Sequence, residues 1–141
     1  MATRNYRHTD NVPTGFESFV LGEGQKKITE TVVTGMSNTS DFTIQKEDHT
    51  LGNLLSEHLK MAPNVMMAGY KVGHPNVPEV LLRVQTDGTI TPREAVVRCC
   101  KQLVAMYGQL GREFQKELAL RKYADQSENA GAEGAGNQNG S

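Results

Sequence analysis

Three residues whose types could do chemistry stand together at Glu47, Asp48 and His49, directly before a run of leucines. Two carboxylates beside an imidazole could act as general acid and base or bind a metal ion. No two histidines in this stretch have the i, i+4 spacing of a helical zinc site, however. Asp48 or Thr50 can instead accept hydrogen bonds from the free backbone N–H groups at a helix start, where acidic side chains also meet the positive end of the helix dipole. The stretch therefore predicts a helix start with Asp48 and Thr50 as candidate caps.

The other candidate sites in the sequence are weaker. Residues 22–27 carry glycines and lysines without the spacing of a phosphate-binding loop. Cys99 and Cys100 are neighbours in a predicted helix, where cysteine acts as a small apolar side chain. The formal net charge of −1 provides no basic field for nucleic acid. We therefore expect no catalytic residue, no cofactor and no bound metal, and we expect an interaction protein in place of an enzyme.

The leucine run itself has the spacing of an amphipathic helix. Its apolar positions recur at intervals of three and four residues, and Pro63 and Asn64 end the pattern. We expect this face to bury against a sheet of the same chain and against a partner together. The residues predicted for this surface are Leu51, Leu54, Leu55 and Leu59.

Strand patterns surround this helix. Residues 41–46 alternate between apolar and polar side chains, which is the two-residue period of a half-buried strand. Residues 65–72 and 79–86 are two further strand candidates, and residues 26–33 are a weaker fourth. The pattern thus predicts a four-stranded sheet with two main helices.

The second helix is the longest element of the prediction. Thr91 is a candidate N-cap, Pro92 suits the first helical position, and Glu94 follows three residues after the cap. About thirty helical residues would extend roughly 45–50 Å, well beyond the roughly 30 Å of a small domain. Its apolar side chains form a near-heptad seam of Val96, Cys100, Leu103, Tyr107, Leu110, Phe114 and Leu118. We expect this seam to bind another chain, unless Gly108 and Gly111 kink the helix or it folds back as a hairpin.

The two ends of the chain differ in composition from its middle. Residues 1–11 and 124–141 contain few large apolar side chains, so neither segment can bury enough surface to offset its ordering entropy. We expect both to be disordered around one domain of residues 12–123. No apolar run approaches the roughly 18 residues of a membrane span, and the cysteine usage is typical of a soluble intracellular protein.

Three phrases in combination resemble one known family: "EDHTLGN", "AGYKVGHP" and "LRVQT". They are similar to the small assembly subunit of multisubunit RNA polymerases, a family that includes archaeal subunit L and the amino-terminal domain of bacterial alpha. The resemblance covers about residues 16–120. One departure is Gly73, which stands where the family often has proline.

The resemblance implies a two-layer α/β (α+β) sandwich with a mostly antiparallel sheet, and a non-catalytic subunit. It implies a heterodimer with the larger third subunit of RNA polymerase II, further contacts with the second-largest and small polymerase subunits, and a location in the nucleus. Residues 16–28 resemble the RNA polymerase II member more closely than the member shared by polymerases I and III. That shared member and a generic protein-interaction module remain as alternatives.

Overall fold

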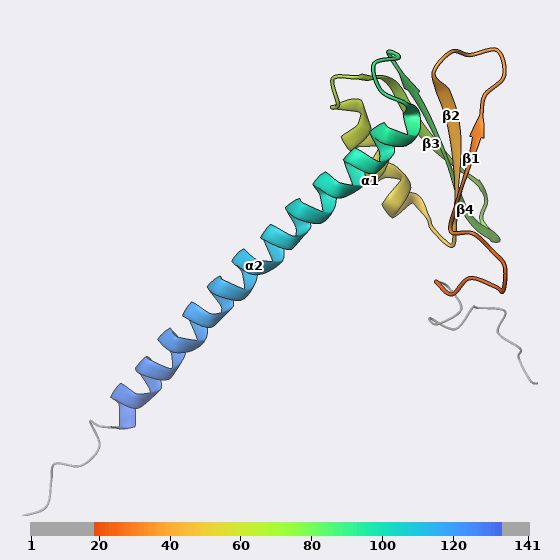
Figure 1. The fold of residues 1–141 in the computed structure, drawn as a ribbon. Coiled ribbons are helices and arrows are strands. Elements are labelled where there is room, and N and C mark those ends of the chain that lie inside the picture. The colour runs from red at the N-terminus through yellow and green to blue at the C-terminus, as the bar shows by residue number, and fades with distance from the viewer. Residues whose placement is uncertain (1–18, 134–141) are drawn as a thin grey trace, which may run out of the picture. The chain divides into compact units, whose positions relative to one another are not determined.

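The structure is a computed structural model that describes residues 19–133 (Figure 1). The predicted N-terminal segment 1–11 lies outside the described residues. In chain order, the described elements are β1 (Ile28–Val32), β2 (Thr39–Gln45), α1 (His49–Lys60), β3 (Val65–His74), β4 (Val77–Thr86) and α2 (Pro92–Glu133). The four strands and two helices occur where the sequence pattern predicts them.

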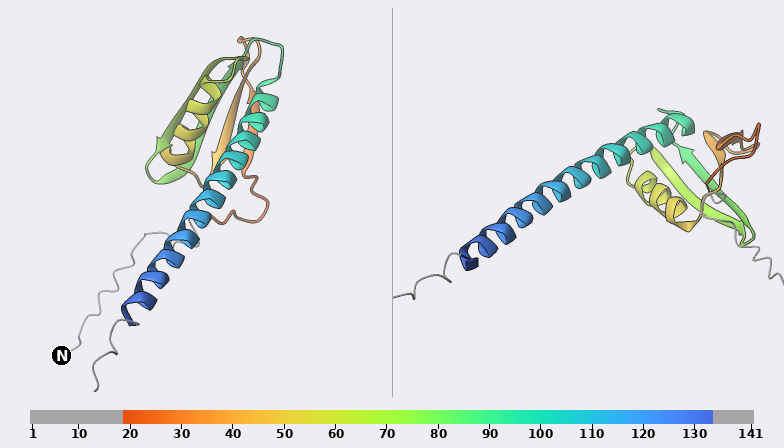
Figure 2. Two further views of the ribbon diagram at one scale, coloured as in Figure 1. Left: turned by 90° about the vertical axis from the view of Figure 1, so that its left-hand side faces the viewer. Right: turned by 90° about the horizontal axis from the view of Figure 1, so that it is seen from below.

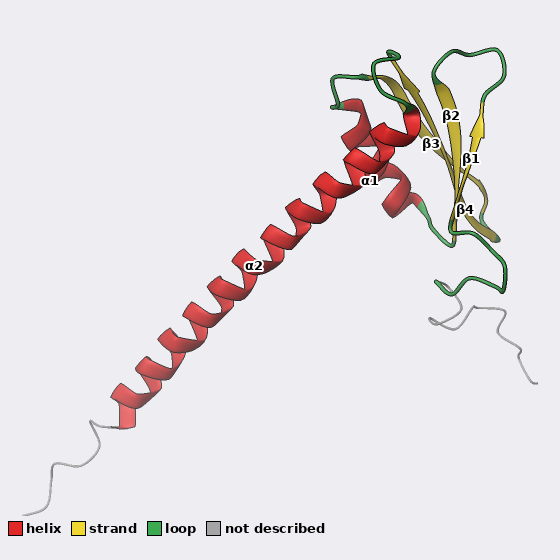
Figure 3. Ribbon diagram, in the orientation of Figure 1, coloured by secondary structure: helices red, strands yellow, loops and turns green. Residues whose placement is uncertain are grey.

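The four strands form one antiparallel sheet in the order β1-β2-β4-β3 (Figure 3). β1 and β3 are therefore its edge strands. α1 packs against β3 and β4. The mostly antiparallel sheet with two helices, the C-terminal one long, confirms the predicted α/β (α+β) fold class.

The core lies on one face of this sheet, here called the helix-covered face. Alternate residues of β2 and β4 are buried there, because successive side chains of a strand point to opposite faces. Leu55 and Leu59 of α1 are also buried. The core side chains of the two central strands are Phe42, Ile44, Val80, Leu82 and Val84. The opposite face of the sheet is here called the outer face.

The chain divides into two compact units with the boundary between Cys99 and Cys100, inside α2. The first turns of α2 belong to the unit that contains the sheet. α2 itself is one uninterrupted helix of 42 residues, about 63 Å long at 1.5 Å per residue (Figure 2). The alternative of a folded-back hairpin is therefore wrong, and Gly108 and Gly111 do not interrupt the helix.

The predicted start of a disordered tail at residue 124 also differs from the structure. α2 continues to Glu133, through residues that the composition assigned to the tail. No proline follows Pro92, and Arg121 pairs with Asp125 one turn later at 3.3 Å, which supports the helix at these residues. In the part of the chain between residues 19 and 133, no helix is long and apolar enough to span a membrane.

Candidate partner interface

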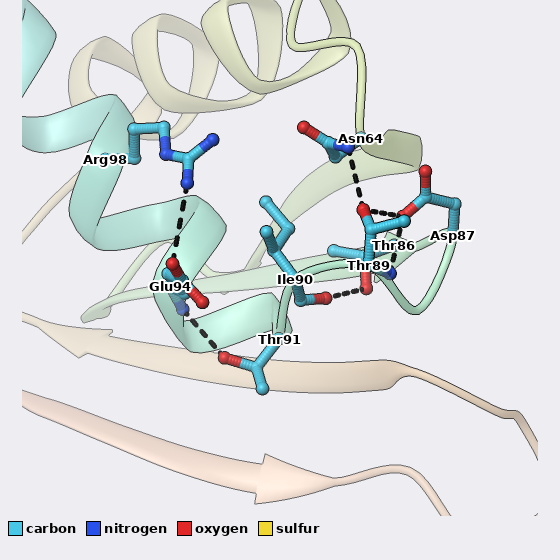
Figure 4. Close-up of polar contacts among 8 residues, drawn as sticks. All are labelled: Asn64, Thr86, Asp87, Thr89, Ile90, Thr91, Glu94 and Arg98. Atoms are coloured by element: carbon cyan, nitrogen blue, oxygen red, sulfur yellow. Dashed lines mark hydrogen bonds and ion pairs between the residues drawn. The ribbon is translucent and has the colours of Figure 1, made fainter.

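The long helix begins at a well-defined cap (Figure 4). The Thr91 hydroxyl oxygen accepts a hydrogen bond from the backbone N–H of Glu94 at 3.1 Å, and the Thr91 carbonyl accepts one from Ala95. Pro92 occupies the first helical position, where its missing N–H costs nothing. Thr91 thus holds the position that the sequence predicts for it.

The loop before this cap is also held by polar contacts (Figure 4). Thr86, at the end of β4, donates its hydroxyl to the carbonyl of Ile90 at 2.6 Å. Asn64 donates to the Thr89 hydroxyl at 2.7 Å, and Asp87 accepts from the backbone N–H of Thr89. The Thr89 hydroxyl also donates to Asp87 Oδ1 at 2.5 Å, and this bond, followed by the one from the Thr89 backbone N–H, holds the pKa of the Asp87 carboxyl below its usual value. Asn64, directly before β3, and Thr86, at the end of β4, thus both hold the loop that leads to the cap.

The first two turns of α2 cover part of the sheet. Ala95, Val96 and Cys99 are buried there. A shallow groove of about 220 Å³ opens beside them, lined by residues of β1, β2 and α2. Its lining is Ile28, Glu30, Phe42, Arg93, Val96 and Val97. Arg93 Nε donates to Glu30 Oε2 at 2.6 Å and so ties the helix to the edge strand across this groove.

An exposed apolar rim beside this groove is a feature that the sequence analysis missed. Ile28, Val32 and Val97 are exposed. Strand register places Ile28 beside Ile44 and Val32 beside Ser40, so both β1 side chains lie on the helix-covered face, where they remain 48% and 72% exposed. Ile28, Glu30 and Val32 are spaced two residues apart, which was the available signal that they share one face of a strand. The weak strand pattern did not indicate which face of the sheet that would be.

Beyond Leu103, α2 presents its apolar side chains to solvent. Tyr107, Leu110, Phe114 and Leu118 of the predicted seam are 45–67% exposed. Val104, Met106, Leu120 and Tyr123 are exposed as well. Such a run of large apolar side chains is unusual on the surface of a monomer and marks an interaction surface.

The predicted seam is not uniform, however. Val96 and Leu103 are buried within the chain itself, with exposed fractions of 7% and 6%. Cys100 is half-buried, and its burial raises the pKa of the thiol. The part of the seam that a partner could still cover therefore consists of Tyr107, Leu110, Phe114 and Leu118. These four are called the distal seam below.

The leucines of α1 also differ from the prediction. Leu55 and Leu59 are 3% and 0% exposed in the isolated chain, so a partner could cover nothing more on them. Leu51 and Leu54 remain partly exposed. The prediction that all four bury against sheet and partner together is therefore wrong for Leu55 and Leu59. One side of the helical stripe faces the sheet completely and belongs to the core.

The three residues with candidate chemistry line one open groove of about 530 Å³ together with His74, and each has a hydrogen-bond partner or ion pair of its own. Glu47 pairs with Lys27. Asp48 caps α1 and accepts from the backbone N–H of Thr50 at 2.9 Å, which holds the pKa of its carboxyl below the usual value. His49 Nδ1 lies 3.2 Å from the Tyr70 hydroxyl. Within residues 19–133, no group of three or more His, Cys, Asp or Glu residues could hold a metal ion.

Of the two candidate caps, only Asp48 is the N-cap. Its backbone is extended, with φ −133° and ψ −165°. Thr50 is already the second residue of the helix and supplies the donor, so its assignment as a cap is wrong. The aspartate is better placed because a cap residue must lie one position outside the helical backbone.

A family model for the RNA polymerase Rpb3/Rpb11 dimerisation domain matches residues 39–113, from the start of β2 into α2. The chain belongs to this family. The resemblance to the assembly subunits of multisubunit RNA polymerases is thereby confirmed. The match contains the buried first turns of α2 and the proximal part of its apolar seam.

The similar proteins are named as subunits of RNA polymerase. DNA-directed RNA polymerase II subunit rpb11 of Dictyostelium discoideum is 38% identical over 117 residues, which cover 82% of this chain and 98% of that protein. A probable RPB11 subunit of Caenorhabditis briggsae is 43% identical over 112 residues, which cover 79% of this chain and 89% of that protein. Among solved structures, subunit L of the RNA polymerase of Thermoplasma acidophilum matches with a TM-score of 0.55 and 25% identity. That match covers 71% of this chain and 96% of subunit L.

Proposed function

We propose that this chain is the RPB11-type subunit of RNA polymerase II, a non-catalytic subunit that forms a heterodimer with the larger third subunit. The heterodimer serves as the platform on which the polymerase assembles, with further contacts to the second-largest and small subunits. The protein works in the nucleus. Its relatives carry the names of RNA polymerase II subunits, which favours this polymerase over polymerases I and III.

The observation that carries the proposal is the exposed distal seam of α2. Burying a large apolar side chain contributes roughly 1.5–3 kcal/mol, and the four residues of this seam leave that free energy unused in the isolated chain. Obligate interfaces are built from such core-like surfaces and bury on the order of 2,000 Å² or more. The exposed rim formed by Ile28, Val32 and Val97 offers a second apolar surface of the same kind.

Co-expression of the full chain with the third subunit tests the proposal. Light scattering should show one defined 1:1 species. Phe114→Asp should abolish that species, because a charge in a dry interface is strongly unfavourable. Phe114 is 67% exposed, so the substitution should leave the fold of the chain intact in circular dichroism.

Gln109→Asp is the matched control. It introduces the same charge on an exposed position of α2, five residues earlier and on a different side of the helix. Heterodimer formation should survive it. The proposal would be contradicted if the chain were a stable monomer that does not bind the third subunit. Undiminished heterodimer formation by Phe114→Asp would contradict it as well.

A further inference from the structure

Gly69 lies in the middle of β3, where the chain itself has no need of a glycine. Its φ is not in the left-handed region, and a Cβ atom built on it would meet nothing within 4 Å. A glycine inside a strand weakens the strand, and it often marks a place where a ligand or another backbone comes close. Nothing in residues 19–133 occupies this space, so it is open to a side chain of another molecule.

The neighbouring strand leaves the space over Gly69 open. Arg83 of β4 is the cross-strand partner of Gly69 on the outer face of the sheet. It donates Nε and Nη2 to the two carboxylate oxygens of Asp41, each at 2.7 Å. Asp41 belongs to β2, on the opposite side of β4 from β3, so this ion pair draws the arginine away from Gly69. The result is a hollow of about 390 Å³.

The lining of this hollow combines apolar and cationic side chains. Met67 and Leu81 supply the apolar part, and Lys71 and Arg83 supply the charge. Arg83 is neutralised by Asp41, whereas Lys71 forms no ion pair within residues 19–133. Among residues 19–133 no carboxylate lines the hollow itself, and the nearby Asp41 carboxylate, which Arg83 already binds, also feels the charge of Lys71. The arrangement is complementary to an apolar side chain accompanied by a carboxylate.

β3 also has an open edge. Among the strands of residues 19–133, it pairs with β4 alone. In the described part of the chain, its sole backbone hydrogen bond outside the sheet is made by Val65 at its start. The pairing of β3 with β4 is irregular at Val65–Met67 and at Val72–His74, and the residues between these two places pair regularly. Such an edge can accept a further strand through backbone hydrogen bonds.

We propose that the regular segment of β3 accepts an extended strand from another protein, with a large apolar side chain opposite Gly69 and an Asp or Glu opposite Lys71. Side chains on one face of a strand recur every second residue, so the bound sequence has an apolar and an acidic residue two positions apart. The large side chain fills the space over the glycine, as aromatic residues do beside glycines in sheets. This surface shares no residue with the distal seam, so the two proposals can fail independently.

Fluorescence anisotropy with two synthetic eight-residue peptides tests the proposal on the full chain co-expressed with the third subunit. Both peptides are rich in Val and Thr. One has Phe and Glu two positions apart, and the other has Lys in place of Glu. The Phe/Glu peptide should bind saturably, and the Phe/Lys peptide about tenfold more weakly or not at all. Absence of saturable binding of the Phe/Glu peptide, or equal binding of the two peptides, would overturn the proposal.

Two variants separate binding from folding. Gly69→Val should raise the melting temperature, because valine favours strands and its Cβ meets open space, while it weakens binding of the Phe/Glu peptide about tenfold. Lys71→Glu should reverse the preference toward the Phe/Lys peptide. Thr29→Val, on the outer face of the opposite edge strand, is the control that should change neither property.

The variants also distinguish this surface from other uses of the same edge. Undiminished peptide binding by Gly69→Val, or an unchanged preference in Lys71→Glu, would refute the assignment. The mass of the complex could also double as its concentration rises, and Gly69→Val could abolish this doubling. That result would assign the edge to a second copy of the complex and would refute the proposed binding of a foreign strand. Loss of the heterodimer in Phe114→Asp concerns the proposed function alone.

Discussion

Gly52 of α1 lies directly against the ring of Tyr70 of β3. A Cβ atom on residue 52 would come within 2.8 Å of Tyr70 Cε2 and 2.9 Å of Cγ, closer than real Cβ atoms approach other carbons. The same ring contacts His49 in a T-shaped arrangement with the ring centroids 5.7 Å apart, and its hydroxyl lies 3.2 Å from His49 Nδ1. The tyrosine is thus held in place, and the first turn of α1 can lie on β3 only because residue 52 has no side chain.

Gly52→Ala should therefore destabilise the chain. The overpacking costs about 1–3 kcal/mol, which exceeds the gain of about 1 kcal/mol that alanine brings to a helix. Combining it with Tyr70→Ala should reverse the sign, so that alanine at position 52 becomes stabilising. Gly111→Ala, whose added Cβ meets nothing within 4 Å, should stabilise by about 0.5–1 kcal/mol. Urea unfolding measures all of these free energies, and a stabilising Gly52→Ala in the wild-type background would refute the contact.

Asp48→Ala should lower the free energy of unfolding by about 0.5–2 kcal/mol, because the first turn of α1 loses its cap. Asp48→Asn keeps an oxygen acceptor and should retain most of the stability. Thr50→Ala should cost less than Asp48→Ala, since the donor to Asp48 is a backbone N–H. If Thr50→Ala were the more damaging change, the capping geometry would be wrong.

The Asp41–Arg83 pair should make stability depend on pH in the acid range. The hydrogen bonds from Arg83, and secondarily its charge, hold the pKa of the Asp41 carboxyl below its ordinary value of 3.8. A carboxylate with a lowered pKa in the folded state stabilises the fold above its unfolded pKa, and this contribution disappears as the pH falls through the folded value. The pair is partly exposed, so we expect roughly 0.2–1 kcal/mol at neutral pH.

Asp41→Asn tests this dependence. The variant should be less stable than the wild type at neutral pH, and the difference should vanish once the pH drops below the folded pKa of Asp41. Thermal unfolding of both proteins between neutral pH and about pH 2 would measure it. A difference that stays constant over this range would mean that the asparagine acts through packing and not through charge.

Core and seam positions should respond differently to truncation. Leu59→Ala should cost about 2–5 kcal/mol of stability, because Leu59 lies on the buried side of α1 and is fully buried. Phe114→Ala should change the stability of the isolated chain by less than about 0.5 kcal/mol, since its side chain faces solvent. Chemical unfolding of the chain and light scattering of the complex would separate the two effects. A large loss of chain stability in Phe114→Ala would show that the distal seam already packs within the monomer.

Much of the element order was readable from the sequence. The alternation at 41–46 and 79–86 predicted two central strands because one face of each is buried and the other is not. The start of α2 was readable because Thr91, Pro92 and Glu94 act through local backbone geometry, which needs no distant partner. The excess of apolar residues along α2 likewise appears in the sequence itself, and it predicted that this helix binds another chain.

The tertiary structure decided what depends on residues far apart in the chain. A helical stripe of leucines spans a wider arc than one sheet can cover, so the repeat could not tell that Leu55 and Leu59 enter the core while Leu51 and Leu54 stay at its margin. The end of α2 depended on helix propensity that composition did not reveal. The ion pair of Asp41 with Arg83, and the empty space that it leaves over Gly69, exist only because strand register brings residues 42 positions apart side by side. Register is a property of the whole sheet, because each strand is aligned by its neighbours and not by its own sequence.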